Sequence, residues 1–312
     1  MIYPVLVAYA LELFPDKTGL AGGVMTAGYG LGAVIWAPLL ASLHQKTGDI
    51  SIALFYIGIL FLVGILALTP FIHTPPEGFR CMIQQEMQQK PSGKVESSGF
   101  KKRGGIVYDI DKPEMLKTSM FYWTMLVLIL GMASGGMVVT QGSPMVQMKL
   151  GITAAEAATV VSLLALANTA GRLICGVASD SLGKVKTVAF LHIITLAVMF
   201  ALVTCEGPYF VVAMMGATFC YGGFACQVAP VTEELFGGKH IGANYSVTYL
   251  SIGLASLFGP QVVGFLRDYF GNYDGGYVFG LGMACVGILA SVQILRQMKK
   301  VQERNAENIG VK

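Results

Sequence analysis

The sequence is poor in charged residues. Only 12% of its 312 residues are Asp, Glu, Lys or Arg, whereas a soluble domain usually carries about 25%. Hydrophobic residues make up 54%, and the mean hydropathy is +0.64. The net charge of +3 comes without a basic run interleaved with aromatic residues, so no nucleic-acid partner is expected. The composition indicates a protein whose main solvent is membrane lipid.

Other features that the sequence lacks argue against an enzyme or a metalloprotein. The six cysteines show no paired spacing, and five lie in apolar segments, which argues against a zinc site or a disulfide framework. No nucleophile–base pair or cluster of metal ligands stands out, so neither catalysis nor a cofactor is expected. The first residues also lack the charged start and the cleavage site of a secretory signal peptide.

Long uncharged stretches are what the chain does contain. A helix needs about 20 apolar residues to cross a bilayer core of ~30 Å. Eight stretches meet this length, one of them broken only by Arg172, while residues 1–11 are apolar but too short to cross alone. We therefore predict an all-α membrane protein with eight full spans and a partial first helix. The spans lie within residues 17–46, 49–77, 117–149, 157–179, 187–205, 206–233, 239–267 and 274–296.

One polar stretch, residues 77–117, separates the spans into two groups and is predicted to be a flexible linker. With this arrangement 17 of the 21 basic residues lie on one side of the membrane and three on the other. Because cytoplasmic loops retain basic residues, we expect a multi-pass plasma-membrane protein whose linker and C-terminus are cytoplasmic. The remaining parts are then residues 1–76 as the remainder of an N-terminal helix bundle, 118–303 as a C-terminal six-helix bundle and 304–312 as a tail.

An internal repeat supports the two-bundle interpretation. The tripeptide Glu-Leu-Phe at residues 12–14 recurs at 234–236, an offset of 222, and Lys17, Ala21 and Pro38 find identical residues at the same offset. Parallel repeats of this kind build the two halves of major facilitator transporters. The second half uses 119 residues to reach its tripeptide and the first uses 14, so a further 105 or so, enough for three helices, are expected to precede this chain. The chain would then hold helices 4 to 12 of twelve. A genuine nine-helix protein is the alternative, less favoured because a half-length span leaves backbone groups unsatisfied in lipid.

A short turn between two spans carries the first recognisable motif. Gly176, Asp180, Gly183 and Lys184 lie at a spacing that resembles the loop signature of the major facilitator superfamily, although Ser181 stands where an arginine is usual. Small residues permit close helix approach, and the aspartate can cap a helix or pair across the two halves. We expect this turn to act as a gate and packing point.

Several longer segments resemble the oxalate/formate antiporter family. They are Phe14–Gly22, Gly28–Gly32 with Ala37-Pro38, Pro113–Thr118, and Gly259-Pro260 followed by Leu266–Gly271. The resemblance covers essentially the whole chain. It implies a transporter of small carboxylates that works by exchange or by proton-coupled transport, with the membrane lipid and the carboxylate as partners, and a monomer is expected.

Arg172 is the strongest candidate for substrate binding. It lies eight residues before Asp180, which places it about 12 Å deeper on a helix, where an arginine costs roughly 2.5–3.5 kcal/mol to insert. No acidic residue lies one turn away on the same helix, and a substrate carboxylate could neutralise it through a bidentate pair. Asn168, one turn earlier, is expected to orient it. The resemblance agrees, since related carboxylate transporters hold an essential arginine in this helix. The alternative is that Arg172 reaches toward the cytoplasm or pairs with an acidic residue in the preceding helices.

Four tyrosines are candidate lining residues of a central cavity. Tyr29, Tyr221 and Tyr249 fall close to the centres of their spans and Tyr3 falls within the partial helix, whereas tyrosines normally lie at the membrane interface. A buried hydroxyl needs a hydrogen-bond partner, which a polar cavity supplies; ordinary packing with a local hydrogen bond is the alternative. Gln141 and His192 are weaker candidates that packing also explains.

The resemblance also bears on which carboxylate is carried. The oxalate transporters of this family use two cationic side chains, and the second, a lysine, aligns with Ile252, in an apolar helix centre. Since a second buried carboxylate would lack a partner, monocarboxylates are expected to be favoured over oxalate. Two other hypotheses remain open: a proton-coupled lactate or pyruvate symporter, and a membrane sensor or interaction protein that does not transport.

Overall fold

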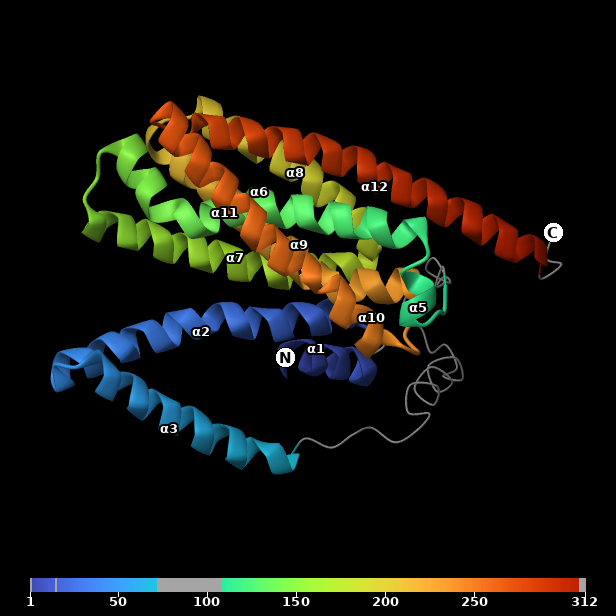
Figure 1. Cartoon of the computed structure of the whole chain (residues 1–312), viewed down its shortest axis with the longest axis horizontal. Coiled ribbons are helices and arrows are strands. Elements are labelled where there is room, and N and C mark those ends of the chain that lie inside the picture. Colours follow the sequence, from blue (N-terminus) through green and yellow to red (C-terminus); the bar gives the residue numbers. More distant parts are fainter. Residues whose placement is uncertain (1, 15, 72–107, 309–312) are drawn as a thin grey trace, which may run out of the picture.

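The structure is a computed structural model that describes residues 2–14, 16–71 and 108–308. The side chains of Tyr3 and Tyr29 lie outside that description. All regular elements in the described ranges are helices (Figure 1). They are α1 (Ile2–Leu13), α2 (Thr18–Thr47), α3 (Ile50–Leu68), the 3-10 turn η1 (Thr69–Phe71), α5 (Lys112–Met115), α6 (Ser119–Leu150), α7 (Ala154–Leu182), α8 (Lys184–Thr204), α9 (Gly207–Phe236), α10 (Ile241–Thr248), α11 (Leu250–Phe270) and α12 (Asp274–Asn308).

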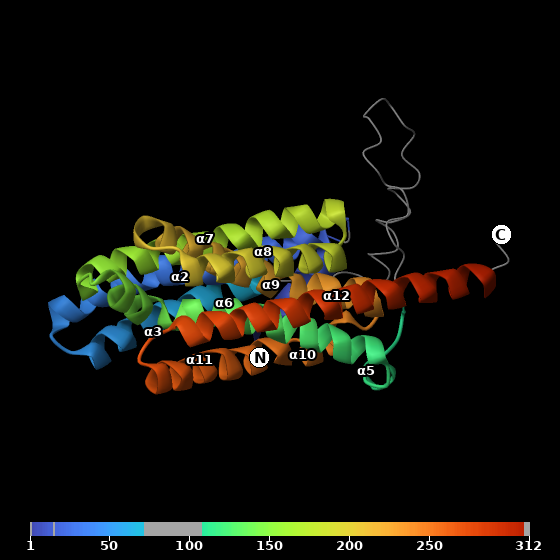
Figure 2. The same cartoon turned by 90° about the horizontal axis from the view of Figure 1, so that it is seen from above.

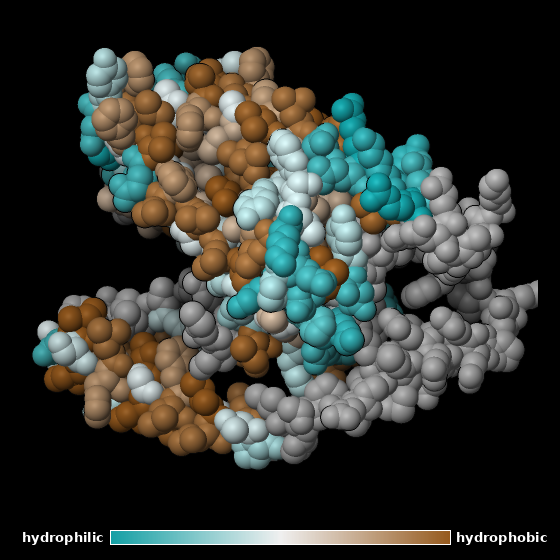
Figure 3. All heavy atoms as spheres, turned by 45° about the vertical axis from the view of Figure 1, so that its right-hand side comes forward, coloured by the Kyte–Doolittle hydropathy of each residue, from teal (hydrophilic) through white to brown (hydrophobic). Residues whose placement is uncertain are grey.

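The helices have the lengths that a membrane requires. Seven helical segments are long and apolar enough to cross a bilayer, and α2 is a further uninterrupted helix of 30 residues. These match the eight predicted spans, with α1 as the partial helix, so the prediction of an all-α membrane protein is confirmed. Figure 3 shows apolar side chains along the sides of the molecule and hydrophilic ones gathered toward its ends, which is the distribution expected of a protein surrounded by lipid.

The six spans from α6 to α12 form one bundle, with α10 and α11 counted as a single span (Figures 1 and 2). Helices α6 and α9 are its most buried members. The turns α6–α7, α8–α9 and α11–α12 lie at one end of this bundle, called the distal end here. The α7–α8 turn, α5 and the α9–α10 turn lie at the other, called the linker end.

The N-terminal helices form a smaller group. Helix α2 packs along α7 and α9, and α1 packs against α2 and α10. Helix α3 contacts α2 and diverges from the rest of the molecule (Figure 1), and among its residues only Ala53 and Ile57 are buried. Its remaining apolar side chains are therefore exposed on this structure.

Glycines allow three helices to approach closely. A Cβ atom on Gly171 of α7 would collide with the backbone of Phe219 on α9, and one on Gly222 of α9 would collide with the backbone of Asn168 on α7. Between α2 and α7, a Cβ on Gly176 would lie 2.6 Å from the carbonyl oxygen of Gly19. These contacts bring α2, α7 and α9 together around the middle of α7.

The end of the predicted flexible linker is ordered rather than flexible. The amide of Tyr108 donates to the carbonyl oxygen of Leu235 (3.0 Å), and that of Ile110 donates to Phe236 (3.2 Å). The buried Asn244 donates its side-chain Nδ2 to the carbonyl oxygen of Ile110 (2.9 Å). Apolar side chains explain the difference, because Tyr108 and Ile110 pack against the core and Met115 of α5 is fully buried. Residues 77–107 of the predicted linker lie outside the described residues.

The span predicted over residues 239–267 consists of two helices. Helix α10 ends at Thr248 and α11 begins at Leu250, and the backbone of Tyr249 between them is helical. Together they form one candidate span, Ile241–Phe270, and Tyr249 lies in its half nearer the linker end. At the C-terminus α12 continues to Asn308, so the helix extends past residue 303, the predicted end of the bundle.

Candidate functional site: a buried arginine between two helix groups

Arg172 is buried between α7 and α2, with 6% of its surface exposed. Its Nε donates to Asn168 Oδ1 (3.0 Å), one turn earlier on α7, and its Nη1 donates to the carbonyl oxygen of Thr26 on α2 (3.2 Å). Asn168 therefore contacts the guanidinium across one helix turn, and its orienting role stays a prediction. The Thr26 carbonyl was not predicted, because a backbone acceptor leaves no mark in the sequence.

No carboxylate neutralises Arg172 within the described part of the chain. A guanidinium carries five N–H donors, and the two hydrogen bonds above occupy two of them. Both acceptors are uncharged, so the positive charge of a buried side chain is left without a counter-ion among the described residues. Their ion pairs are Lys149–Asp274, Lys184–Asp180, Arg267–Asp268 and Lys299–Glu303.

The arginine lies at a depth shared by both helix groups. It precedes the end of α7 at Leu182 by ten residues, or about 15 Å. Thr26 follows the start of α2 at Thr18 by eight residues, or about 12 Å. The guanidinium therefore joins the N-terminal helices to the C-terminal bundle well inside the apolar part of the molecule.

The predicted loop motif closes the linker end of the same helix pair. Both carboxylate oxygens of Asp180 accept hydrogen bonds from α2, from the amides of Gly19 and Leu20 (2.8 Å each). Lys184 forms an ion pair with the same carboxylate. The amides belong to the first turn of α2, where free N–H groups and the helix dipole favour a negative charge. Asp180 thus caps a helix of the other group.

The other motif residues support this cap. Gly176 lies at the close crossing with Gly19, and Gly183 ends α7 with a φ of +97°, a conformation that glycine adopts readily. Glu234 of α9 contributes a cap that the motif did not predict, since its Oε2 accepts from the amide of Val185 in the first turn of α8 (3.1 Å). The repeated Glu-Leu-Phe tripeptide was the signal that could have identified this residue.

The two described tyrosine candidates occupy the edge of an apolar cluster. Tyr221 of α9 packs over Gly135 and Gly136 of α6. Tyr249 stands edge-on to the buried Tyr245, with ring centroids 5.6 Å apart. Ile252, on the first turn of α11, packs against the same cluster. Tyr3 and Tyr29, the other two candidates, have side chains outside the described part of the structure.

The weaker candidates His192 and Gln141 each make a polar contact with another part of the bundle. His192 is fully buried, with its Nε2 3.2 Å from the carbonyl oxygen of Val127 and its ring 4.7 Å from that of Phe224. Gln141 accepts a hydrogen bond from the hydroxyl of Tyr273 (3.4 Å) near the distal end.

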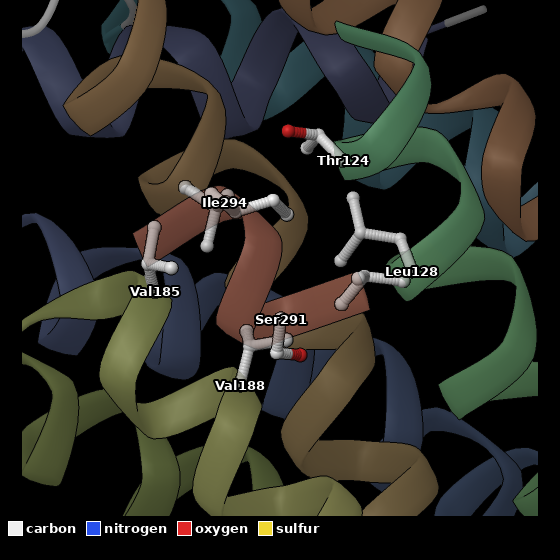
Figure 4. Close-up of a pocket in the computed structure, with 8 residues that line it drawn as sticks. Thr124, Leu128, Val185, Val188, Ser291 and Ile294 are labelled. Atoms are coloured by element: carbon white, nitrogen blue, oxygen red, sulfur yellow. The ribbon is translucent and has the colours of Figure 1, made fainter. Parts of the chain in front are cut away.

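A void inside the C-terminal bundle is too small to hold a substrate. Figure 4 shows it between α6, α8 and α12, lined by Leu128, Val185, Val188 and other mainly apolar side chains. Its volume of about 10 Å³ is roughly that of one water molecule. Within the described ranges, no group of three His, Cys, Asp or Glu residues is placed to hold a metal ion.

Comparison with known proteins identifies the family. The model of the Major Facilitator Superfamily matches residues 1–260 and, in a second alignment, 124–310. The oxalate:formate antiporter of Oxalobacter formigenes is 26% identical over 275 residues, covering 87% of this chain and 60% of its own length. Monocarboxylate transporter 10 of Danio rerio is 28% identical over 120 residues, covering 37% of this chain and 24% of its own length.

Solved structures show the same fold. The Escherichia coli fucose:proton symporter superimposes with a TM-score of 0.63 at 12% identity, over 94% of this chain and 73% of the symporter. The chain spans about three fifths of the length of the Oxalobacter formigenes antiporter that it matches. These relatives and the fold neighbour are transporters and not enzymes. The chain is a multi-pass membrane protein that belongs to the Major Facilitator Superfamily.

Proposed function

We propose that the protein is a secondary active transporter of small organic carboxylates, with Arg172 as the anion-binding residue. The observation that carries this proposal is a guanidinium, 6% exposed, whose described partners are a neutral amide and a backbone carbonyl. An uncompensated buried charge is costly, and a carboxylate provides both the counter-charge and a bidentate geometry. The oxalate:formate antiporter and the monocarboxylate transporter among its relatives both carry carboxylates by name.

The mechanism that fits this geometry is alternating access. The two helix groups meet at Arg172 and, nearer the linker end, at Asp180. A carboxylate can bind the N–H donors of Arg172 that neither Asn168 nor the Thr26 carbonyl occupies. Binding neutralises the charge that lies between the helix groups, which lowers the barrier to their rocking. We infer that the linker end faces the cytoplasm, because 17 of the 21 basic residues lie on that side.

We also propose that monocarboxylates such as formate, lactate or pyruvate are preferred over oxalate. Ile252 lies in the first turn of α11, packed against an apolar cluster. A second carboxylate next to it would be buried without a cation. Removing such an unpaired charge from water costs on the order of several kcal/mol in a protein. Tyr221 and Tyr249 are proposed to line the substrate path, together with Tyr3 and Tyr29.

Uptake by the full-length protein in proteoliposomes tests the proposal. We expect labelled monocarboxylates to enter and Arg172→Gln to abolish their uptake. Arg172→Lys should retain only part of it, because lysine lacks the planar pair of donors. Arg296→Gln is the matched control, since that arginine is exposed on α12. Wild-type rates in Arg172→Gln would refute the assignment.

Competition experiments in the same vesicles test the preference. Formate or lactate should inhibit uptake more strongly than oxalate, and Ile252→Lys should shift the order toward dicarboxylates. Tighter inhibition by oxalate in the wild type would contradict the preference. A proton-coupled lactate or pyruvate symporter is the second candidate, and the monocarboxylate transporter among the relatives supports its substrate class. An imposed pH gradient that drives uptake without an exchanging anion would select it.

A further inference from the structure

A larger cavity lies away from Arg172, at the distal end of the C-terminal bundle. Its volume is about 210 Å³, and it opens between the last turn of α6 and the turn that joins α11 to α12. Lys149 of α6 lines one side, and Asn272, Tyr273, Asp274 and Tyr277 line the other. This volume is sufficient for a small organic anion, and the residues come from helices that are distant in the sequence.

The only charge pair of this cavity, within the described residues, is loose. Lys149 Nζ is 4.0 Å from Asp274 Oδ1, and the two side chains are 28% and 52% exposed. The ammonium also lies 6.0 Å from the centroid of the Phe210 ring. An exposed pair at this distance contributes little to stability, so Lys149 remains available to another anion.

Two further groups offer hydrogen-bond donors to the same space. Tyr277 is 1% exposed, its ring packs edge-on against Phe210 with centroids 6.1 Å apart, and its hydroxyl has no hydrogen bond within the described part of the chain. Asn272 uses its Oδ1 to accept from the amide of Asp274 (3.1 Å). This bond fixes the orientation of the side-chain amide and leaves its NH₂ group free. Because Tyr277 lines the cavity, its hydroxyl is available to donate a hydrogen bond to an anion there.

Tyr273 lines the same cavity, and its hydroxyl has hydrogen-bond partners. Its oxygen donates to Gln141 (3.4 Å) and accepts from Arg267 Nη1 (3.4 Å). Lys149 and Gln141 are eight residues apart on α6, hence on one face of the helix and about 12 Å apart in depth. Gln141 therefore places a second polar side chain on α6, deeper in the bundle than the cavity.

We propose that this cavity is a capture site for the carboxylate group of the transported anion on the outer side of the membrane. The ammonium of Lys149 provides the charge, and the Tyr277 hydroxyl and the Asn272 amide donate hydrogen bonds to the carboxylate oxygens. Asp274, which competes for Lys149, keeps the affinity low enough for release toward Arg172. This inference rests on the proposed function, since the anion captured is the anion carried.

A binding test that does not depend on transport examines the site directly. Met148 lines the cavity and is 53% exposed, so Met148→Cys, in full-length protein, reports on occupancy through its reaction with a membrane-impermeant thiol reagent. The parent protein without this substitution gives the background labelling. Formate added outside should slow the reaction of the introduced cysteine, including in an Arg172→Gln background. The protection should disappear in Lys149→Gln and weaken in Tyr277→Phe.

Vesicles of neutral lipid, with and without added anionic lipid, distinguish a free carboxylate from a lipid phosphate. Protection by formate in neutral vesicles supports the proposal. Slowing that occurs with anionic lipid but not with formate would overturn it, and so would protection that persists in Lys149→Gln.

Transport kinetics provide the second measurement. Lys149→Gln should raise the external KM about tenfold, the equivalent of one lost charged contact, with the maximal rate and the internal KM unchanged. Lys239→Gln, which removes an exposed lysine at the linker end, should leave the external KM unchanged. Equal shifts on both sides of the membrane would contradict an outer capture site. If the wild type carried no carboxylate while formate still protected Met148→Cys, the proposed function would fail and the anion site would stand.

Discussion

The linker end and the distal end of the bundle hold their charges in opposite ways. At the linker end, Asp180 accepts two backbone hydrogen bonds from α2 and pairs with Lys184, with both charged side chains at most 16% exposed. At the distal end, Lys149 and Asp274 are 4.0 Å apart and Asp274 is half exposed. The helix groups are tied together at the first end, whereas the charges at the second end line an open cavity. Contacts near the linker end should therefore hold the two helix groups together and stabilise the protein. Contacts at the distal end should affect ligand access with little effect on stability.

The largest effect is expected where helix backbones touch. Gly171→Ala places a methyl group against the backbone of Phe219, so α7 and α9 must separate, at a cost of about 2–3 kcal/mol. Gly264→Ala is the matched control in α11, because its new methyl group meets open space and alanine favours a helix by about 1 kcal/mol. Thermal unfolding in detergent should show a lower midpoint for the first variant and an equal or higher one for the second. Equal midpoints in the two variants would show that the α7–α9 contact is not tight.

An intermediate effect is expected from the helix cap. Asp180→Ala removes the acceptor for the Gly19 and Leu20 amides, which should cost about 1–2 kcal/mol. The protection of these amides against hydrogen exchange should fall by about tenfold. Asp268→Ala removes the carboxylate of an exposed pair at the distal end and should leave the exchange of Gly19 and Leu20 unchanged. Unchanged protection in Asp180→Ala would mean that the linker end is held by other contacts.

The smallest effect on stability is expected at the distal pair. Lys149→Gln should change the free energy of unfolding by less than about 0.5 kcal/mol, because an exposed pair 4.0 Å apart contributes little. The midpoint of thermal unfolding in detergent checks this. A loss comparable to that of Asp180→Ala would show that both ends contribute equally, and the contrast between them would be lost.

Much of the fold could be predicted from the sequence, because lipid imposes simple requirements. Uncharged stretches of more than about 20 residues report spans directly, and the cost of an intramembrane charge draws attention to Arg172. The loop from Gly176 to Lys184 could be recognised because it depends on small residues and a cap at fixed spacing. These features are local, and one segment of sequence suffices to predict each.

The parts that escaped prediction depend on which segments meet in space. The Thr26 carbonyl is a backbone group, so the residue type does not indicate that it accepts a hydrogen bond from Arg172. Neither proline nor glycine marks the boundary between α10 and α11 at Tyr249. The distal cavity combines Lys149 with Tyr277, which lie on different helices and carry no common motif. The anchored end of the linker was missed because its few apolar residues are surrounded by polar ones.

The central claim is that the guanidinium of Arg172 binds the carboxylate of the substrate. Equilibrium binding tests this claim most directly. Binding of labelled formate to purified full-length protein can be measured without transport, in the wild type, in Arg172→Gln and in the control Arg296→Gln. We predict saturable binding in the wild type and in Arg296→Gln, and an affinity at least about tenfold weaker in Arg172→Gln, which lacks the charge-assisted pair. Equal affinity in Arg172→Gln and the wild type would contradict the account.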